Sequence, residues 1–205
     1  MRDAARLRRA FFNRPTLIVA EELLGTFLVH RTADGVTSGR IVEVEAYIGE
    51  DDPACHAAPG PTRRNRPLYG PPGFSYVYLN YGMHYLTNVV TEAEGSPAAI
   101  LLRALEPADG LELMRRRRAR LGAAIADADL CRGPGNLSRA LGITLTQNWL
   151  DLEGEELFLE DRGARPVDVV WSRRIGIRVG TEPLWRCHVR ESTAISGPGR
   201  SRTSS

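Results

Sequence analysis

The chain has 205 residues, 42% of them hydrophobic, and a formal net charge at pH 7 of only +2. This length buries one substantial core, so we expect a single domain, and no apolar run reaches the 18 residues of a membrane-spanning helix. All 27 basic residues are arginine, which excludes a lysine as nucleophile or base, and three scattered cysteines exclude a disulfide framework or a CxxC zinc site.

The first half of the chain predicts helices followed by strands. Residues 1–15 have amphipathic spacing and lack the apolar core of a signal peptide, so we expect a short helix that stops near Pro15 and a cytoplasmic protein. Residues 15–25 have helical spacing and end at Gly25. Strands are predicted at residues 26–31 and 37–47, joined as a hairpin, and at residues 74–81, 84–91 and 98–105.

The second half mixes helices and short strands. Helices are predicted at residues 108–122 and 127–142, the latter broken at Gly133-Pro134. Between the first-half strands at 37–47 and 74–81, residues 49–73 form a long irregular segment rich in proline and glycine, which in a compact domain is usually functional or disordered. The remaining predictions are strands at 157–161, 167–177 and 184–190, a single domain over 1–196, and a disordered polar tail at 197–205.

Two glutamates and a tyrosine share one face of the strand IVEVEAY. Because side chains alternate along a strand, Glu43, Glu45 and Tyr47 lie on one face, and Val42, Val44 and Ala46 form a core face. The two carboxylates are spaced by roughly 6–7 Å, as in pairs that activate water for glycosidic cleavage. The spacing alone equally fits a solvated face or glutamates paired with arginine.

An aromatic run follows in FSYVYLNYGMHY. Tyr76 and Tyr78 share a strand face, and we expect Tyr76 to pack in the core. Tyr81 precedes Gly82 at what reads as a hairpin tip, where a ring has little to pack against. A protruding ring is what proteins use as a wedge between DNA base steps.

Charged residues and a histidine complete the candidates. Arg103 stands alone in an apolar strand and requires a carboxylate partner, with Glu45 or Glu43 the nearest choice. His56 follows Cys55, but the deaminase zinc signature is absent, so no metal is expected. The arginines of residues 61–67 suit contacts with a DNA backbone, whereas those of 114–120 fit either a solvated helix face or phosphate contacts.

Taken together, these segments resemble the alkyladenine (3-methyladenine) DNA glycosylase family. The resemblance runs from TLIVAEELLGTFLV to CHVR, most of the chain, and rests on four segments in this order: RIVEVEAYIGEDDPACHA, RNRPLYGPPGFSYVYLNYGMHYLTNVV, AILLRALEP and RIGI. It implies a single compact α/β domain of the α+β type, with a curved, mostly antiparallel sheet surrounded by helices.

The resemblance also implies roles for individual residues. Glu45 matches the general base that activates water, and Arg103 and the backbone carbonyl of Ile175 match groups that hold that water. The remaining matches are Tyr47, His56 and Tyr78, which enclose the flipped base; Asn88, which rejects guanine at the pocket floor; and Tyr81, Met83, Arg64 and Arg66, which contact DNA. Glu43 receives no role.

The implied function is excision of alkylated or deaminated purines from double-stranded DNA. The enzyme flips the base and hydrolyses its N-glycosidic bond, leaving an abasic site without cutting the strand. We expect no cofactor, no metal, no membrane partner and a monomer in the cytoplasm, associated with the nucleoid in a bacterium. Two alternatives are a non-catalytic binder of damaged DNA and a hydrolase of small nucleosides.

Overall fold

The structure, a computed structural model, describes residues 4–119, 125–166 and 168–197. The predicted tail at 197–205 therefore lies outside the described residues, except for Gly197. In chain order the elements are β1 (Ala5–Arg6), α1 (Arg9–Phe12), α2 (Thr16–Leu23), β2 (Phe27–Thr32), β3 (Gly35–Ile48), η1 (Arg66–Tyr69), β4 (Ser75–Asn80), β5 (His84–Val90), β6 (Ala98–Pro107), α3 (Leu111–Arg118), α4 (Asp127–Leu130), α5 (Pro134–Leu141), η2 (Leu145–Gln147), β7 (Leu157–Asp161), β8 (Val169–Ser172) and β9 (Arg186–Val189).

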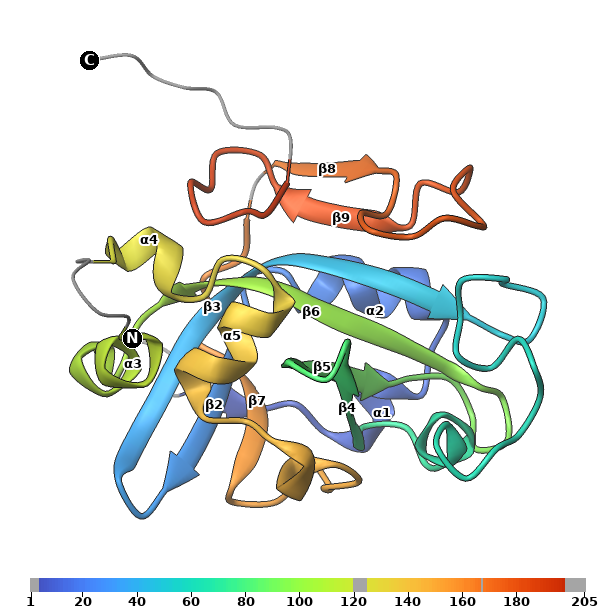
Figure 1. The fold of residues 1–205 in the computed structure, drawn as a ribbon, viewed down its shortest axis with the longest axis horizontal. Helices are drawn as coiled ribbons and strands as arrows, with labels where there is room; N and C mark the ends of the chain where they lie inside the picture. The colour runs from blue at the N-terminus through green and yellow to red at the C-terminus, as the bar shows by residue number, and fades with distance from the viewer. Residues whose placement is uncertain (1–3, 120–124, 167, 198–205) are drawn as a thin grey trace.

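The strands form one antiparallel sheet in the order β1-β7-β2-β3-β6-β5-β4. β9 pairs with β3 over residues 43–45 and with β8 on its other side. Figure 1 shows β3 and β6 as long, curved neighbours that cross the molecule. This single α+β domain with an antiparallel sheet confirms the predicted fold class, and the predicted hairpin of the first two strands is β2–β3.

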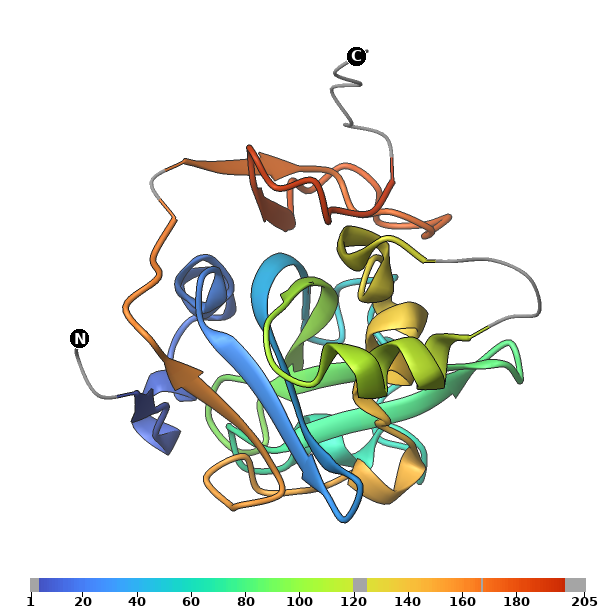
Figure 2. The ribbon, with the colours of Figure 1, turned by 90° about the vertical axis from the view of Figure 1, so that its left-hand side faces the viewer.

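Helices cover the sheet on two sides. Figure 2 shows α2 on one side of β2 and β3 and the helices α3 to α5 on the other, with the β8–β9 hairpin above them. The main hydrophobic core fills the spaces between them with completely buried side chains such as Leu23, Ile41, Leu102 and Leu141. Burying such side chains supplies most of the free energy that fixes the strands, so residues on β3 and β6 stand on a rigid base.

β3 carries a local irregularity near the two glutamates. The pairing register with β6 shifts between Ile41 and Glu43 and again between Glu43 and Val44, and such bulges redirect side chains. Val44 belongs to the main core, but Val42 packs in a separate small cluster with Ala194 and Ile195. Both valines are completely buried, which confirms the prediction that they are core residues, although they pack in two separate clusters.

The N-terminal helix is shorter than predicted. Ala5 and Arg6 instead form an edge strand on β7, and helical structure is limited to Arg9–Phe12. Arg6 explains the difference, because its guanidinium pairs with Glu155 and stacks 3.7 Å from the centre of the Phe158 ring. These contacts with β7 and the turn before it hold the segment extended.

The strand predicted at 167–177 ends early, at Ser172, and Val167 lies outside the described residues. Gly176 has a φ of +79°, a left-handed conformation that does not continue a regular strand. Arg174 is buried and directs its guanidinium to the Asp52 carboxylate rather than along the sheet. The chain therefore leaves β8 and turns toward the end of β3.

The arginine run at 114–120 serves neither of its two predicted purposes in full. Arg117 and Arg118 donate to backbone carbonyls of α5 and α4, respectively, and so tie α3 to these helices. Arg116 is exposed, and Arg120 lies outside the described residues. Two of its five arginines are therefore structural.

Candidate active site

Two completely buried carboxylates, Glu43 and Glu45, lie at the centre of the site on the same face of β3. Arg103 reaches both of them from β6: its Nε donates to Glu43 over 3.0 Å and its Nη1 to Glu45 over 3.1 Å. Burial alone lowers the pKa of Arg103, but the Glu45 and Glu43 carboxylates outweigh burial and raise it. The predicted pairing of Arg103 is confirmed, with both glutamates rather than one.

Glu45 has three donors and one open acceptor position. Arg103 and the Tyr47 hydroxyl, at 2.9 Å, donate to Oε2, and the Ile175 N–H donates to Oε1 over 2.7 Å. A carboxylate can accept about four hydrogen bonds, so one position on Oε1 has no partner among the residues that the structure describes. Burial and the Glu45 charge raise the pKa of Tyr47 far above its ordinary value, which keeps its phenol protonated as a donor.

Glu43 differs from Glu45 because it has four donors rather than three, and three of the four meet the same oxygen. Oε1 accepts from Arg103, Arg186 and the Ser196 hydroxyl, and Oε2 accepts from the Ser196 N–H over 2.6 Å. These four donors match the capacity of a carboxylate. Glu45 therefore accepts one hydrogen bond fewer than Glu43.

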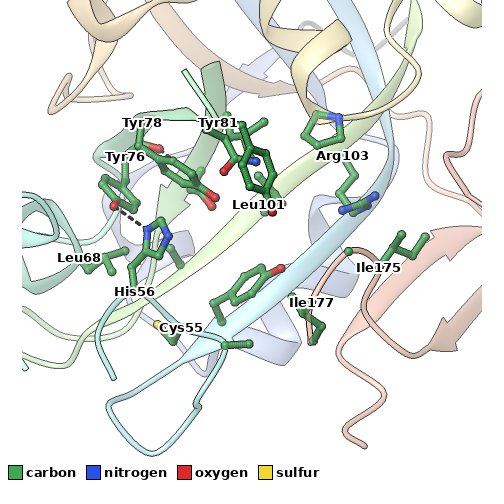
Figure 3. Close-up of a pocket in the computed structure, with 18 residues that line it drawn as sticks. Cys55, His56, Leu68, Tyr76, Tyr78, Tyr81, Leu101, Arg103, Ile175 and Ile177 are labelled. Atoms are coloured by element: carbon green, nitrogen blue, oxygen red, sulfur yellow. Dashed lines mark hydrogen bonds between the residues drawn. The ribbon is translucent and has the colours of Figure 1, made fainter. Parts of the chain in front are cut away.

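A cavity of about 340 Å³ opens beside Glu45. Figure 3 shows its walls, with Tyr76, Tyr78 and His56 on one side and Arg103, Ile175 and Ile177 on the other. Glu45 itself contributes no surface to the cavity and meets it only through the lining residues Tyr47, Arg103 and Ile175, which all contact the carboxylate. Arg103 and Ile175, predicted to hold the water, thus lie around Glu45 together with Tyr47, predicted to enclose the base. Ile175 contacts Glu45 through its N–H, and the role of its carbonyl stays a prediction.

Three aromatic residues form one wall. His56 Nδ1 lies 2.8 Å from the Tyr76 hydroxyl, and the His56 ring meets the Tyr78 ring edge-on with centroids 4.5 Å apart. Burial, and secondarily the Arg64 charge, lowers the pKa of His56, and burial raises that of Tyr78 to about 12. At neutral pH both rings are therefore uncharged. Tyr76 is buried as predicted, yet it also lines the cavity.

Asn88 lines the same cavity from β5. It is buried, and its side-chain amide donates to the Tyr76 carbonyl over 2.9 Å on the neighbouring strand. That bond fixes the rotamer and leaves the amide oxygen and one N–H for a ligand. Asn88 therefore presents polar groups to the cavity, and its role in rejecting guanine stays a prediction.

The β4–β5 hairpin ends at the rim of this cavity. Tyr81 is 81% exposed and Met83 is 71% exposed, so two large apolar side chains project from the tip. Tyr81 has a φ of +49° and Gly82 of +68°, and the Met83 N–H closes the turn on the Asn80 carbonyl. A left-handed tyrosine costs of order 1–3 kcal/mol, and such strain often marks a functional position.

Arg64 of the irregular segment lies beside a ring that lines the cavity, whereas Arg66 lies beside a ring that does not. Arg64 lies 5.6 Å from the centre of the Tyr78 ring, and Arg66 lies 5.8 Å from the centre of the Trp149 ring. Both arginines are exposed. The Arg64 guanidinium therefore adds positive charge beside the cavity.

A second buried ion pair, which the sequence did not indicate, holds the segment that carries Ile175. Arg174 binds both oxygens of Asp52 over 2.6 and 2.8 Å and donates to the Ala46 carbonyl. Its guanidinium also lies 4.7 Å from the centre of the Tyr47 ring. The sequence offers many arginines and no signal that distinguishes this one.

The described residues contain no group of three or more His, Cys, Asp or Glu side chains placed to hold a metal ion. Burial raises the pKa of the Cys55 thiol to about 11, so it stays protonated beside His56. Within the same residues, no helix has the length and apolar character needed to cross a membrane.

Comparisons with known proteins agree on one family. A family model described as methylpurine-DNA glycosylase matches residues 10–193. A protein of Chlorobium phaeobacteroides named "Putative 3-methyladenine DNA glycosylase" is 48% identical over 194 residues, covering 94% of this chain and 96% of its own. Proteins with the same name from Burkholderia lata (47% identical; 94% of this chain, 91% of its own) and Rubrobacter xylanophilus (49%; 80% and 84%) are similar as well.

Proposed function

We propose that this protein, which belongs to the methylpurine-DNA glycosylase family and is a DNA N-glycosylase of base-excision repair, acts as a monomer on double-stranded DNA. It hydrolyses the N-glycosidic bond of alkylated or deaminated purines and so releases them from the DNA. The observation that carries this proposal is the buried Glu45, which keeps one open acceptor position beside an aromatic cavity. The combination suits a water-activating base next to a flipped nucleotide.

The cavity walls suit an extruded purine. Tyr47, His56 and Tyr78 offer ring surfaces that replace the stacking a base loses when it leaves the duplex. An alkylated purine is cationic, so electron-rich rings attract it more than a normal base. The neutral state of His56 supports this role, because a protonated imidazole would repel such a base. Asn88 is placed to reject the exocyclic amine of guanine.

The chemical step proceeds from the open position on Glu45. A water there gives its proton to the carboxylate while its oxygen bonds to C1′, and the C1′–N bond breaks with its electron pair leaving on the base. The carboxylate also stabilises the positive charge that develops on the sugar. Arg103 and Ile175 hold the carboxylate oriented for this transfer.

Both alternative functions fit the site less well. A protein that only binds damaged DNA gains nothing from a buried carboxylate with an unused acceptor, since burying charge is costly. A hydrolase of free nucleosides needs no exposed, strained Tyr81 at the cavity rim.

The proposal is tested by incubating the protein with duplexes that each contain 3-methyladenine, 7-methylguanine, hypoxanthine or ethenoadenine. We expect release of at least one of these as a free base, detected by mass spectrometry, and none from an undamaged duplex. A protein that binds such duplexes but releases no base from any of them would be the non-catalytic binder.

Tyr81→Ala should affect double-stranded substrate far more than single-stranded substrate. The ring matters only where a neighbouring base stack must be held open, and removing it costs of order 1–3 kcal/mol of stacking, about 10- to 100-fold in affinity for a lesion duplex. Affinity and excision are compared on both substrates, with Leu145→Ala, another exposed apolar residue, as the control. Equal losses on both substrates would contradict the wedge.

A further inference from the structure

We infer that Glu43, Ser196 and Arg186 form a positioning device that prevents Arg103 from closing the water position on Glu45. This inference rests on the proposed function, because it concerns how the general base is kept available. None of the three residues lines the cavity, and all three act through Arg103.

The guanidinium of Arg103 is fixed at all three nitrogens. Nη1 donates to Glu45, whereas Nε donates to Glu43 and Nη2 donates to the Ser196 hydroxyl over 2.9 Å. A planar guanidinium with three different acceptors cannot rotate without losing two of them. Only one of its nitrogens therefore reaches Glu45.

The single contact matters because arginine and carboxylate groups usually pair through two parallel hydrogen bonds. If Nη2 or Nε also turned to Glu45, the carboxylate would have four donors: two from Arg103, one from Tyr47 and one from Ile175. Its acceptor capacity would then be filled, and no position would remain for the attacking water. Holding Nε and Nη2 elsewhere keeps that position open.

Glu43 and Ser196, which accept hydrogen bonds from Arg103, are in turn fixed by hydrogen bonds with Arg186 and with each other. Arg186 donates from Nε to Glu43 over 2.7 Å, from Nη1 to the Ser172 hydroxyl and from Nη2 to the Ser196 carbonyl over 3.0 Å. The Ser196 N–H and hydroxyl both donate to Glu43. Glu43, Glu45, Arg103 and Arg186 together carry no net charge, which allows the cluster to be buried.

Ser196→Ala isolates this device. The change keeps every charge and the two backbone contacts of residue 196. It removes only the hydroxyl, which accepts from Nη2 of Arg103 and donates to Glu43. Glu43→Gln is less suitable, since it leaves two buried guanidinium groups short of negative charge and endangers folding. The measurements are the single-turnover excision rate, the half-saturating concentration of lesion duplex and the thermal midpoint.

Ser38→Ala is a matched control on β3, the strand that carries Glu43 and Glu45. The Ser38 hydroxyl is buried, donates to the Asp109 carboxylate and accepts from Arg162, so its loss removes a comparable set of contacts. It lies seven residues from Glu45 along β3, roughly 23 Å away. Its loss should lower the thermal midpoint about as much as that of Ser196, without changing the excision rate.

We expect Ser196→Ala to lower the single-turnover rate about 10-fold, part of the roughly 10²- to 10⁴-fold that general-base catalysis contributes. Half-saturation should change less than twofold. A rate equal to that of Ser38→Ala, or an equal loss of rate and affinity, would overturn the inference. If the wild-type protein itself releases no base, the proposed function fails instead, so the two failures are distinguishable.

Discussion

Glu45→Gln should lower the single-turnover excision rate at least a hundredfold. The variant should still bind lesion duplex as tightly as the wild-type protein does. The amide has nearly the same size but cannot take a proton from water, and general-base catalysis contributes roughly 10²- to 10⁴-fold. The loss extends further because the amide no longer offsets positive charge on the sugar. Tyr47, His56 and Tyr78, which line the cavity and are proposed to bind the base, are unchanged in this variant.

Glu45→Gln should also lower the stability of the fold, so the control variant should be destabilised to a similar extent. The amide nitrogen must face one of the three donors that now meet Glu45, and an unsatisfied buried donor costs of order 1–3 kcal/mol. Glu106→Gln is a suitable control, since Glu106 pairs with Arg40 on the same two strands outside the cavity. Excision by Glu45→Gln at a rate near that of the control would show that another group activates the water.

The face shared by Glu43, Glu45 and Tyr47 was predictable because a strand alternates its side chains whatever surrounds it. The pairing of Arg103 was predictable from the cost of burying a lone charge. Both are local or nearly local arguments. The two register shifts of β3 were not predictable, because a bulge depends on the partner strand and leaves no mark in IVEVEAY.

The support of the site came from distant parts of the chain. Ser196 meets Glu43 across 153 residues, and Arg174 meets Asp52 across 122. A serine near a polar tail and one arginine among 27 have no periodicity or spacing that singles them out. Side chains that line the cavity could be matched by the family resemblance, whereas those that hold them depend on the tertiary structure.

The reaction should stop at the abasic site, with the DNA strand intact and no covalent intermediate with the protein. Enzymes that go on to cut the strand attack C1′ with an amine, form a Schiff base and lose the 3′ phosphate by elimination. None of the 205 residues is lysine, and the guanidinium of arginine does not lose its proton in proteins. No side chain can therefore supply the amine.

Water on Glu45 is then the nucleophile that the site provides, and its product is a hydroxyl at C1′ of an uncut strand. The measurement is borohydride reduction during turnover, together with a denaturing gel run without heat or alkali, and a lysine-dependent glycosylase serves as the positive control. We expect the gel to show full-length strand that breaks only after alkali, and no protein–DNA adduct. A trapped adduct would mean that an amine, the one at the N-terminus included, reaches C1′, and strand breaks without alkali would mean that elimination follows; either result would exclude a purely hydrolytic mechanism through Glu45.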